Sequence, residues 1–203
     1  SVAGGYYNTA HAAHSAVAGG QSNTARAPHA SVGGGQYNVA DDMWSSVVGG
    51  RQNHVSGESS VIGGGLSNVV LHSYSCIGGG SANTANATWS VVGGGRSNQA
   101  SGESSAVSGG HSNTAHAKYG TIGGGWFNVA YGYSATVAGG YNNAAAGYGG
   151  VVTGGFYNTA RGFHSSVGGG NHNAADGKFG TVAGGYYNVV LGYAGIVAGG
   201  SYN

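Results

Sequence analysis

The sequence contains very little charge and no long apolar run. Six Lys or Arg and five Asp or Glu make up only 5% of its 203 residues, where a soluble domain usually has about a quarter. The net charge is +1 and no Lys or Arg cluster is present, which argues against a nucleic-acid partner. No run of 18 apolar residues occurs, so we expect a segment that does not span a membrane.

Proline and cysteine occur once each, as Pro28 and Cys76. A single cysteine cannot form an intrachain disulfide, and we expect Cys76 to be a small strand residue. Glycine is abundant, at 46 residues, but it does not fall on every third residue, which excludes a collagen helix. Val, Ile and aromatic residues recur in register, which argues against disorder.

What the sequence does contain is one repeat of fifteen residues. Asparagine recurs at this spacing from Asn8 to Asn203 without insertion or deletion. Two glycines precede each asparagine by four and three residues, and Val or Ile precedes it by six. A strict period of this kind is typical of a solenoid. We therefore predict one repeat domain over residues 1–203, with about 13.5 coils.

The hydrophobic pattern within one repeat predicts strands. We number repeat positions from the asparagine, which is position 0. Apolar and polar residues alternate around positions 0–3 and 7–10, so each repeat should contain two short strands separated by two turns. The predicted fold is all-β: a parallel β-roll or β-solenoid with one 15-residue coil per repeat. Side chains at positions 7, 9, 0 and 2 should point inward.

The paired glycines and the asparagine are expected to be structural. We predict that both glycines of a pair supply the positive φ of a tight turn, and that valine at either member would be very damaging; the representative turn glycines are Gly94, Gly95, Gly109 and Gly110.

The asparagines are expected to form a hydrogen-bonded stack of amides that also caps the turn; a row of ligand-binding amides is the alternative. The predicted ladder comprises Asn8, Asn23, Asn38, Asn53, Asn68, Asn83, Asn98, Asn113, Asn128, Asn143, Asn158, Asn173 and Asn188.

Charged and aromatic residues are sorted by position. Every charged residue lies at position 3, 4, 5 or 13, so the outward positions 8 and 10 form an uncharged face, which is usually covered by a partner. All aromatic residues except Tyr131 lie in the turns. We expect them to pack along the edges or against another chain; a strip that binds sugars or surfaces is the alternative. The candidate contact edge consists of Tyr6, Tyr7, Trp126, Phe127, Tyr141, Phe156, Tyr157, Tyr186 and Tyr187. The opposite edge carries Trp44, Tyr74, Trp89, Tyr119, Tyr133, Tyr148, Phe163, Phe179 and Tyr193.

No residue pattern points to catalysis. The nine histidines are spread over six repeat positions, whereas a metal site needs ligands that converge. Asp41 and Asp42 are adjacent, and neighbouring strand residues point to opposite faces. The glycine runs lack the lysine of a phosphate-binding loop. The prediction is a protein that is not an enzyme, with no catalytic residue, metal or cofactor.

One stretch resembles a known family. The pattern Ala-x-Gly-x-x-Ser-x-Val-x-Gly at 100–109 is similar to the head repeats of YadA-like trimeric autotransporter adhesins, and related repeats occur in phage tail-fibre-like proteins. The resemblance implies a left-handed roll, three chains side by side and display on a bacterial surface. The family's repeat is usually one residue shorter, and the doubled glycine and fixed asparagine are departures from it.

Three functions are therefore weighed. The first is an extracellular or cell-surface shaft, the head or fibre segment of a trimeric adhesin, whose partners are copies of itself and, as a variant, a glycan or host-surface ligand; a phage tail-fibre segment that binds surface glycans is an alternative to it. The second is an ice-binding solenoid that uses the uncharged face. The third is a subunit of a self-assembling filament, or a fragment of a longer chain, because both ends stop in mid-repeat without a cap.

Overall fold

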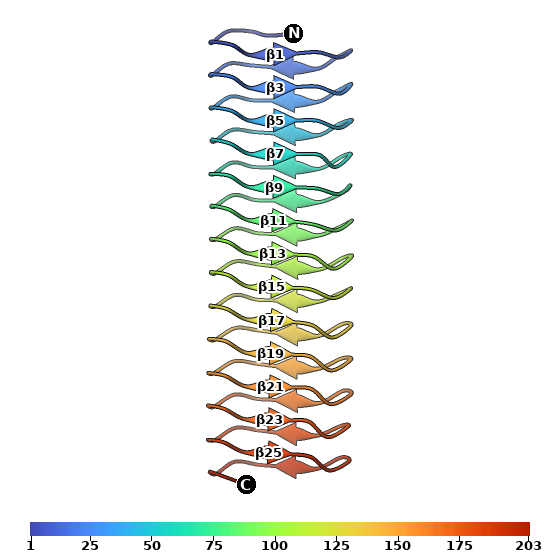
Figure 1. Ribbon diagram of the computed structural model, residues 1–203, viewed down its shortest axis with the longest axis vertical. Helices are drawn as coiled ribbons and strands as arrows, with labels where there is room; N and C mark the ends of the chain where they lie inside the picture. Colours follow the sequence, from blue (N-terminus) through green and yellow to red (C-terminus); the bar gives the residue numbers. More distant parts are fainter. The chain divides into compact units, whose positions relative to one another are not determined.

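The computed structural model describes residues 1–203 and contains only short β-strands and turns. Two compact units, Ser1–Ala100 (unit 1) and Ser101–Asn203 (unit 2), are described separately. In each unit one repeat forms one coil, and each strand pairs in parallel with the equivalent strand of the next coil (Figure 1). The predicted all-β, parallel β-solenoid is confirmed, whereas a single domain over 1–203 stays a prediction. The structure contains no helix that could cross a membrane.

Unit 1 has two parallel sheets, one of odd-numbered and one of even-numbered strands. The odd-numbered strands are β1 (Thr9–Ala10), β3 (Thr24–Ala25), β5 (Val39–Ala40), β7 (His54–Val55), β9 (Val69–Val70), β11 (Thr84–Ala85) and β13 (Gln99–Ala100). The even-numbered strands are β2 (Ala16–Val17), β4 (Ser31–Val32), β6 (Ser46–Val47), β8 (Val61–Ile62), β10 (Cys76–Ile77) and β12 (Val91–Val92). The register is one repeat throughout, as when Ala25 of β3 pairs with Ala40 of β5.

Unit 2 repeats the arrangement. Its even-numbered strands are β14 (Ala106–Val107), β16 (Thr121–Ile122), β18 (Thr136–Val137), β20 (Val151–Val152), β22 (Ser166–Val167), β24 (Thr181–Val182) and β26 (Ile196–Val197). Its odd-numbered strands are β15 (Thr114–Ala115), β17 (Val129–Ala130), β19 (Ala144–Ala145), β21 (Thr159–Ala160), β23 (Ala174–Ala175) and β25 (Val189–Val190).

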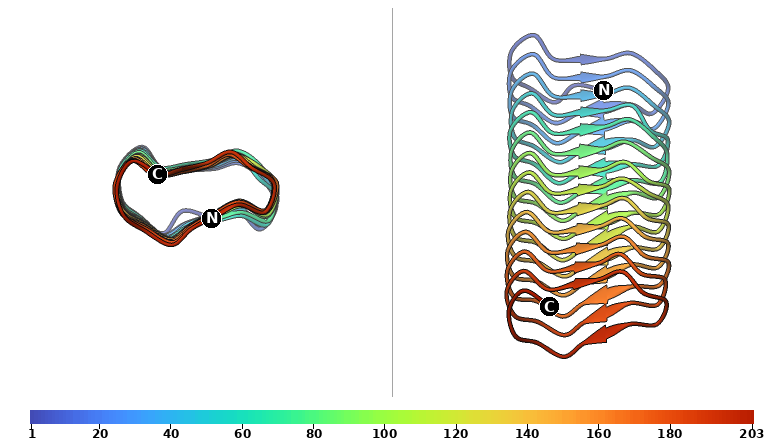
Figure 2. Two further views of the ribbon diagram at one scale, coloured as in Figure 1. Left: turned by 90° about the horizontal axis from the view of Figure 1, so that it is seen from below. Right: turned by 60° about the horizontal axis from the view of Figure 1, so that its bottom comes forward.

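Each coil is a flattened loop with the two strands on its long sides and a turn at each end (Figure 2). The interior is therefore thin. It holds Val or Ile at position 9, Ala or Val at position 2, asparagine at position 0 and Ser, Ala or Gly at position 7. The largest buried side chains are those of Ile62, Ile77 and Ile122. The inward positions agree with the prediction, because alternation along a strand sends every second side chain to the same face.

Two corners in every coil have a backbone that the sequence did not predict. The residues at positions 6 and 14 have positive φ although almost all of them are not glycine, for example Trp44 (φ 54°) and Tyr37 (φ 56°). Such a conformation costs about 1 kcal/mol. The amides at these corners donate to the preceding coil, Tyr37 N to Gln21 O (3.0 Å) and Trp44 N to Pro28 O (3.3 Å). These hydrogen bonds offset the strain, and the bulky side chains project outward.

Candidate functional site

Four surfaces surround each coil. The glycine turn is formed by positions 11–14 and the serine turn by positions 4–7. The odd face consists of the outward side chains of the odd-numbered strands, at positions 1 and 3. The even face consists of those of the even-numbered strands, at positions 8 and 10.

The asparagine ladder lies inside the coils beside the glycine turn, and Asn38 shows its geometry. Its Nδ2 donates to Gly34 O in the same turn (2.9 Å) and to Gly50 O in the next coil (2.8 Å). Its Oδ1 accepts from the backbone N of Asn53, one coil further (3.0 Å). Both amide hydrogens and the oxygen are thus used, and Asn38 is fully buried.

This geometry corrects the expected stack in one respect. The amides bond to the backbone of the next coil and not to each other; Asn203, whose Nδ2 donates to Asn188 Oδ1 (2.9 Å), is the exception. The reason is that two glycine carbonyls lie within reach, one in the same turn and one in the next coil, and they match the two amide hydrogens. Burial and full hydrogen bonding leave a residue such as Asn38 no free group with which to bind a ligand.

In the representative pairs Gly94–Gly95 and Gly109–Gly110 the two glycines have different roles, so the prediction for them was half wrong. The second glycine has positive φ, as in Gly95 (85°) and Gly110 (89°). A Cβ on Gly110 would lie 2.2 Å from Gly125 O. The first glycine has no such constraint: a Cβ on Gly109 meets nothing within 4 Å, and one on Gly94 meets only Gly79 O at 4.0 Å. In these two pairs only the second glycine is required by the backbone; the first glycine also has positive φ in three other pairs, at Gly64 (159°), Gly169 (155°) and Gly199 (159°).

The even face carries no charged residue in either unit. It contains Ser, Thr, Ala, Gly and Val, together with Cys76 and Ile196. Exposed apolar side chains include Val48, Val91 and Val151, and around Val48 the surface has a shallow hollow of about 400 Å³. Hydroxyl groups on adjacent coils bond to each other, Ser31 Oγ to Ser46 Oγ at 3.0 Å. The face is regular, small and without charge.

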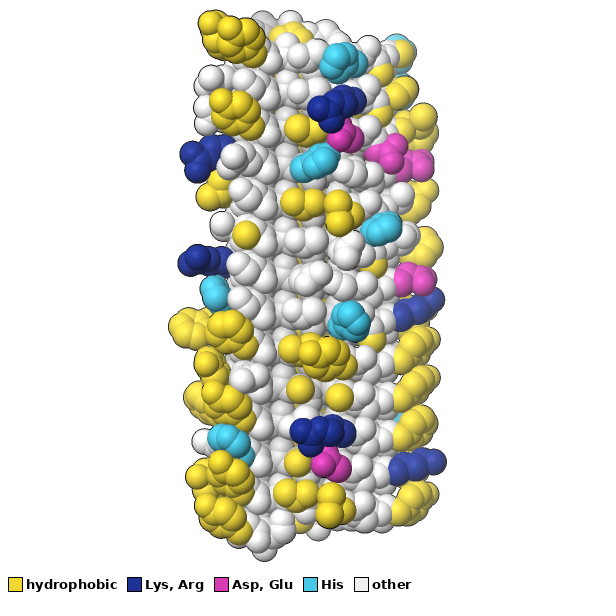
Figure 3. Space-filling model, viewed as in Figure 1, with side chains coloured by type: hydrophobic (Ala, Val, Ile, Leu, Met, Phe, Trp, Pro, Cys, Tyr) yellow, Lys and Arg dark blue, Asp and Glu magenta, His cyan; other side chains and the backbone are white.

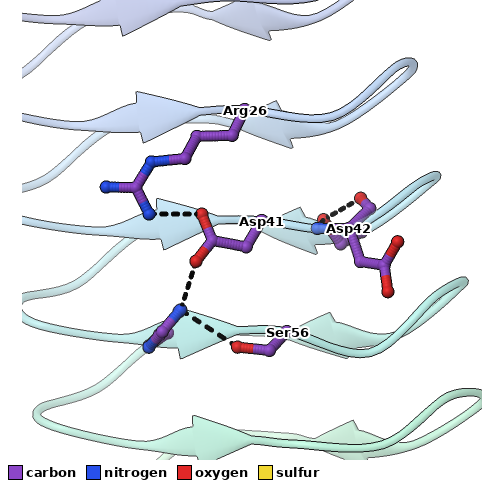
Figure 4. A network of polar contacts seen from close by, with 6 residues as sticks. Arg26, Asp41, Asp42 and Ser56 are labelled. Carbon is purple, nitrogen blue, oxygen red and sulfur yellow. Dashed lines mark hydrogen bonds and ion pairs between the residues drawn. The ribbon is translucent and has the colours of Figure 1, made fainter.

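The odd face differs because its charges are paired within the chain (Figure 3). Arg26 Nη1 lies 2.6 Å from Asp41 Oδ1, and His54 Nε2 lies 2.7 Å from Asp41 Oδ2, which forms a network across three coils (Figure 4). Arg161 and Asp176 repeat the arrangement in unit 2, at 3.0 Å. Opposite charges one coil apart at the same position neutralise each other, so they are not left to bind a group outside the chain.

The candidate contact edge is a ladder of rings in unit 2. Phe127, Tyr141 and Phe156 follow one another with ring centroids 5.9 and 6.1 Å apart. His172 stacks between Tyr157 (4.8 Å) and Tyr187 (4.5 Å). A hydrogen bond with Tyr157 raises the pKa of Tyr141, and desolvation together with the neighbouring Tyr186 raises the pKa of Tyr202. In unit 1 this edge has few rings, and Tyr6 and Tyr7 contact each other, at 4.2 Å.

The serine-turn edge also forms a ladder. Tyr133, Tyr148 and Phe163 stack with interplanar angles of 9° and 14°, and Lys178 Nζ lies 5.1 Å from the ring centroid of Phe163. Several histidines, which the sequence pattern left without a role, belong to these ladders. His14 and His29, for example, stack with their ring centroids 4.9 Å apart. Their shared turn positions with the aromatic residues were the signal that could have identified them.

No group of three or more His, Cys, Asp or Glu side chains converges as a metal site would require. Partial burial raises the pKa of the Cys76 thiol, which lies on the even face. A hydrogen bond from Lys118 to Glu103 (2.9 Å) raises the pKa of Lys118. The arrangement offers surfaces for contact: one uncharged face and two aromatic edges.

Comparison with known proteins adds no family to this description. No protein-family model matches the chain, and no curated protein matches it.

Proposed function

We propose that the chain is a non-enzymatic structural segment of an extracellular adhesin or fibre, which associates side by side with copies of itself through the even face. The observation that carries the proposal is the contrast between the two faces. Charges on the odd face are neutralised within the chain, whereas the even face has no charge to desolvate in any coil.

The shape of the even face suits a second sheet. Its side chains are short, so a facing sheet can approach closely, as sheets in a sandwich do at about 10 Å. A continuous uncharged surface of this kind is usually covered. Small solenoids also gain stability from association, because each coil buries little apolar area. The resemblance to trimeric adhesin heads favours three copies.

Mass measurement by light scattering tests the proposal. We expect the chain at about 50 µM to be a trimer or larger, and a monomeric mass would contradict the proposal. The double variant Val91→Lys, Val151→Lys introduces charge on the even face, where these side chains are 41% and 38% exposed, and should be monomeric because a buried unpaired charge is costly.

A matched control lies on the odd face. Val189 is 42% exposed, so Val189→Lys makes the same chemical change at similar exposure. We expect its mass to equal that of the original chain. If Val189→Lys also dissociates the oligomer, the interface does not lie on the even face alone.

Ice binding is the second candidate and uses the same face. The observation in its favour is the regular placement of hydroxyls one coil apart, as in Ser31 and Ser46 or Ser166 and Thr181 (3.2 Å). Threonine occupies position 8 only at Thr121, Thr136 and Thr181, which makes the row irregular. Thermal hysteresis in a solution of monomeric chain would favour this candidate over self-association.

A further inference from the structure

The serine-turn edge of unit 1 has a gap in its ring ladder. Every coil of this edge carries a ring at position 6 except one: the residues are His14, His29, Trp44, Ser59, Tyr74 and Trp89. Trp44 stacks on His29 with an interplanar angle of 26°, and Tyr74 stacks on Trp89 with an angle of 17°. The face of each ring that points toward Ser59 has no ring partner.

The width of the gap follows from the coil spacing. Ser59 has the same backbone conformation (φ 52°) as Trp44 (54°) and Tyr74 (60°), and its N donates to Met43 O while Tyr74 N donates to Glu58 O, both at 2.9 Å. The turns are therefore stacked without interruption. Two steps of about 4.8 Å place the facing rings about 10 Å apart. A group midway lies about 5 Å from each ring centroid, within the range of a cation–π contact.

The charges around the gap are acidic. Glu58 precedes Ser59, and its carboxylate forms no ion pair or side-chain hydrogen bond. Asp42 lies in the preceding coil and has no cationic partner; its Oδ1 accepts from Met43 N (2.7 Å). In the same sequence context in unit 2, Glu103 is neutralised by Lys118. Figure 3 shows acidic side chains where the apolar column on this edge is interrupted.

From this arrangement we infer that the gap between Trp44 and Tyr74 is a binding site for an organic cation of the quaternary ammonium type. Two aromatic faces supply the cation–π contacts, Ser59 forms the floor, and Glu58 with Asp42 supplies the opposite charge. Both rings are half exposed, at 51% and 50%, so the slot is open to solvent. The site lies on a turn edge and does not depend on association through the even face.

Titration of the full chain with tetramethylammonium chloride at constant ionic strength tests the inference. The readout is the chemical shift of the Trp44 indole Nε1–H. We expect saturation with a dissociation constant on the order of 1 mM. A shift that does not saturate by about 50 mM overturns the proposal.

Neutral probes test the chemistry of the ligand. The uncharged alcohol 3,3-dimethyl-1-butanol, whose tert-butyl group has the shape of the trimethylammonium group, and methyl β-glucoside should each bind at least about tenfold more weakly, because neither gains the cation–π attraction. Binding of either neutral probe with equal strength would show an apolar or sugar site and overturn the assignment to a cation.

Variants locate the site. Ser59→Tyr completes the ladder with a residue that position 6 accepts in Tyr74, and should weaken binding by more than about tenfold. Ser134→Tyr makes the same change at the same repeat position (φ 53°), where Tyr133 already supplies a ring, and should leave binding unchanged. Glu58→Gln keeps the shape and should weaken binding about threefold to tenfold. Unchanged affinity in Ser59→Tyr or in Glu58→Gln contradicts the proposal.

Discussion

The glycine turn and the serine turn both reverse the chain, but different interactions hold them. Both reverse the chain through a corner residue with positive φ. In the glycine turn, the asparagine makes repeated bonds to its own turn and to the next coil, as Asn68 does with Gly64 O (2.9 Å) and Gly80 O (3.0 Å). Because these bonds depend on one side-chain length and both donors, the same residue recurs in every coil.

The serine turn is less uniform. Ser75 Oγ donates to Ala87 O in the next coil (2.7 Å) and accepts from Ser90 N (3.1 Å). By contrast, the buried Oγ atoms of Ser105 and Ser165 have no hydrogen-bond partner. Alanine or glycine also occupies this position. The comparison indicates that the serine turn selects mainly for a small side chain, whereas the glycine turn selects for particular hydrogen bonds.

The largest effect is expected from a change that keeps the size of the ladder residue. Asn68→Asp removes both donors and places a carboxylate beside the carbonyls of Gly64 and Gly80 in a fully buried site. We expect a loss of about 4 kcal/mol in the free energy of unfolding, measured by urea denaturation at pH 7. A loss below about 1 kcal/mol would show that the ladder is not what holds this turn.

The two glycines of one pair give an intermediate test within a single turn. Gly110→Ala should cost about 3 kcal/mol, because the Cβ clashes with Gly125 O and the φ of 89° is unfavourable for alanine. Gly109→Ala should cost less than about 1 kcal/mol, because its Cβ meets open space. Thermal unfolding of the two variants in parallel measures the difference, and equal costs would contradict the distinction.

The smallest effects belong to the serine turn. Ser105→Ala removes a buried hydroxyl without a partner, so stability should be unchanged or higher by up to about 1 kcal/mol. Ser75→Ala removes every hydrogen bond of its Oγ, of which those to Ala87 O and from Ser90 N are the shortest, and should cost about 1.5 kcal/mol. Urea denaturation of both variants sharpens the comparison with the glycine turn. A stability loss for Ser105→Ala as large as that for Asn68→Asp would contradict the difference between the two turns.

Most of the fold could be predicted from the repeat. The period gives one coil per fifteen residues, and the alternation identifies which positions lie inside; these inferences needed no partner chain or distant contact. The absence of charged residues from positions 8 and 10 likewise identified the even face from the sequence alone. The corners at positions 6 and 14 could not be predicted, because Tyr, Trp, His and Ser there give none of the glycine or asparagine signal of a positive φ.

The candidate sites divide in the same way. The sequence placed the rings on two edges. It did not show that His172 lies between Tyr157 and Tyr187, or that the rings of Trp44 and Tyr74 face each other across a gap in the ladder. Those relations depend on the direction of each side chain at a turn and on the step between coils.

The sequence by itself determined the period, the all-β class, the inward positions and the sidedness of charge, because each is a property of residues close together along one coil. Tertiary structure decided which carbonyls the asparagines bond, which glycine of a pair is indispensable and which charges cancel. The physical reason is that hydrogen bonds and ring contacts between residues fifteen apart depend on the offset and orientation of adjacent coils, and these exist only once the coils are stacked.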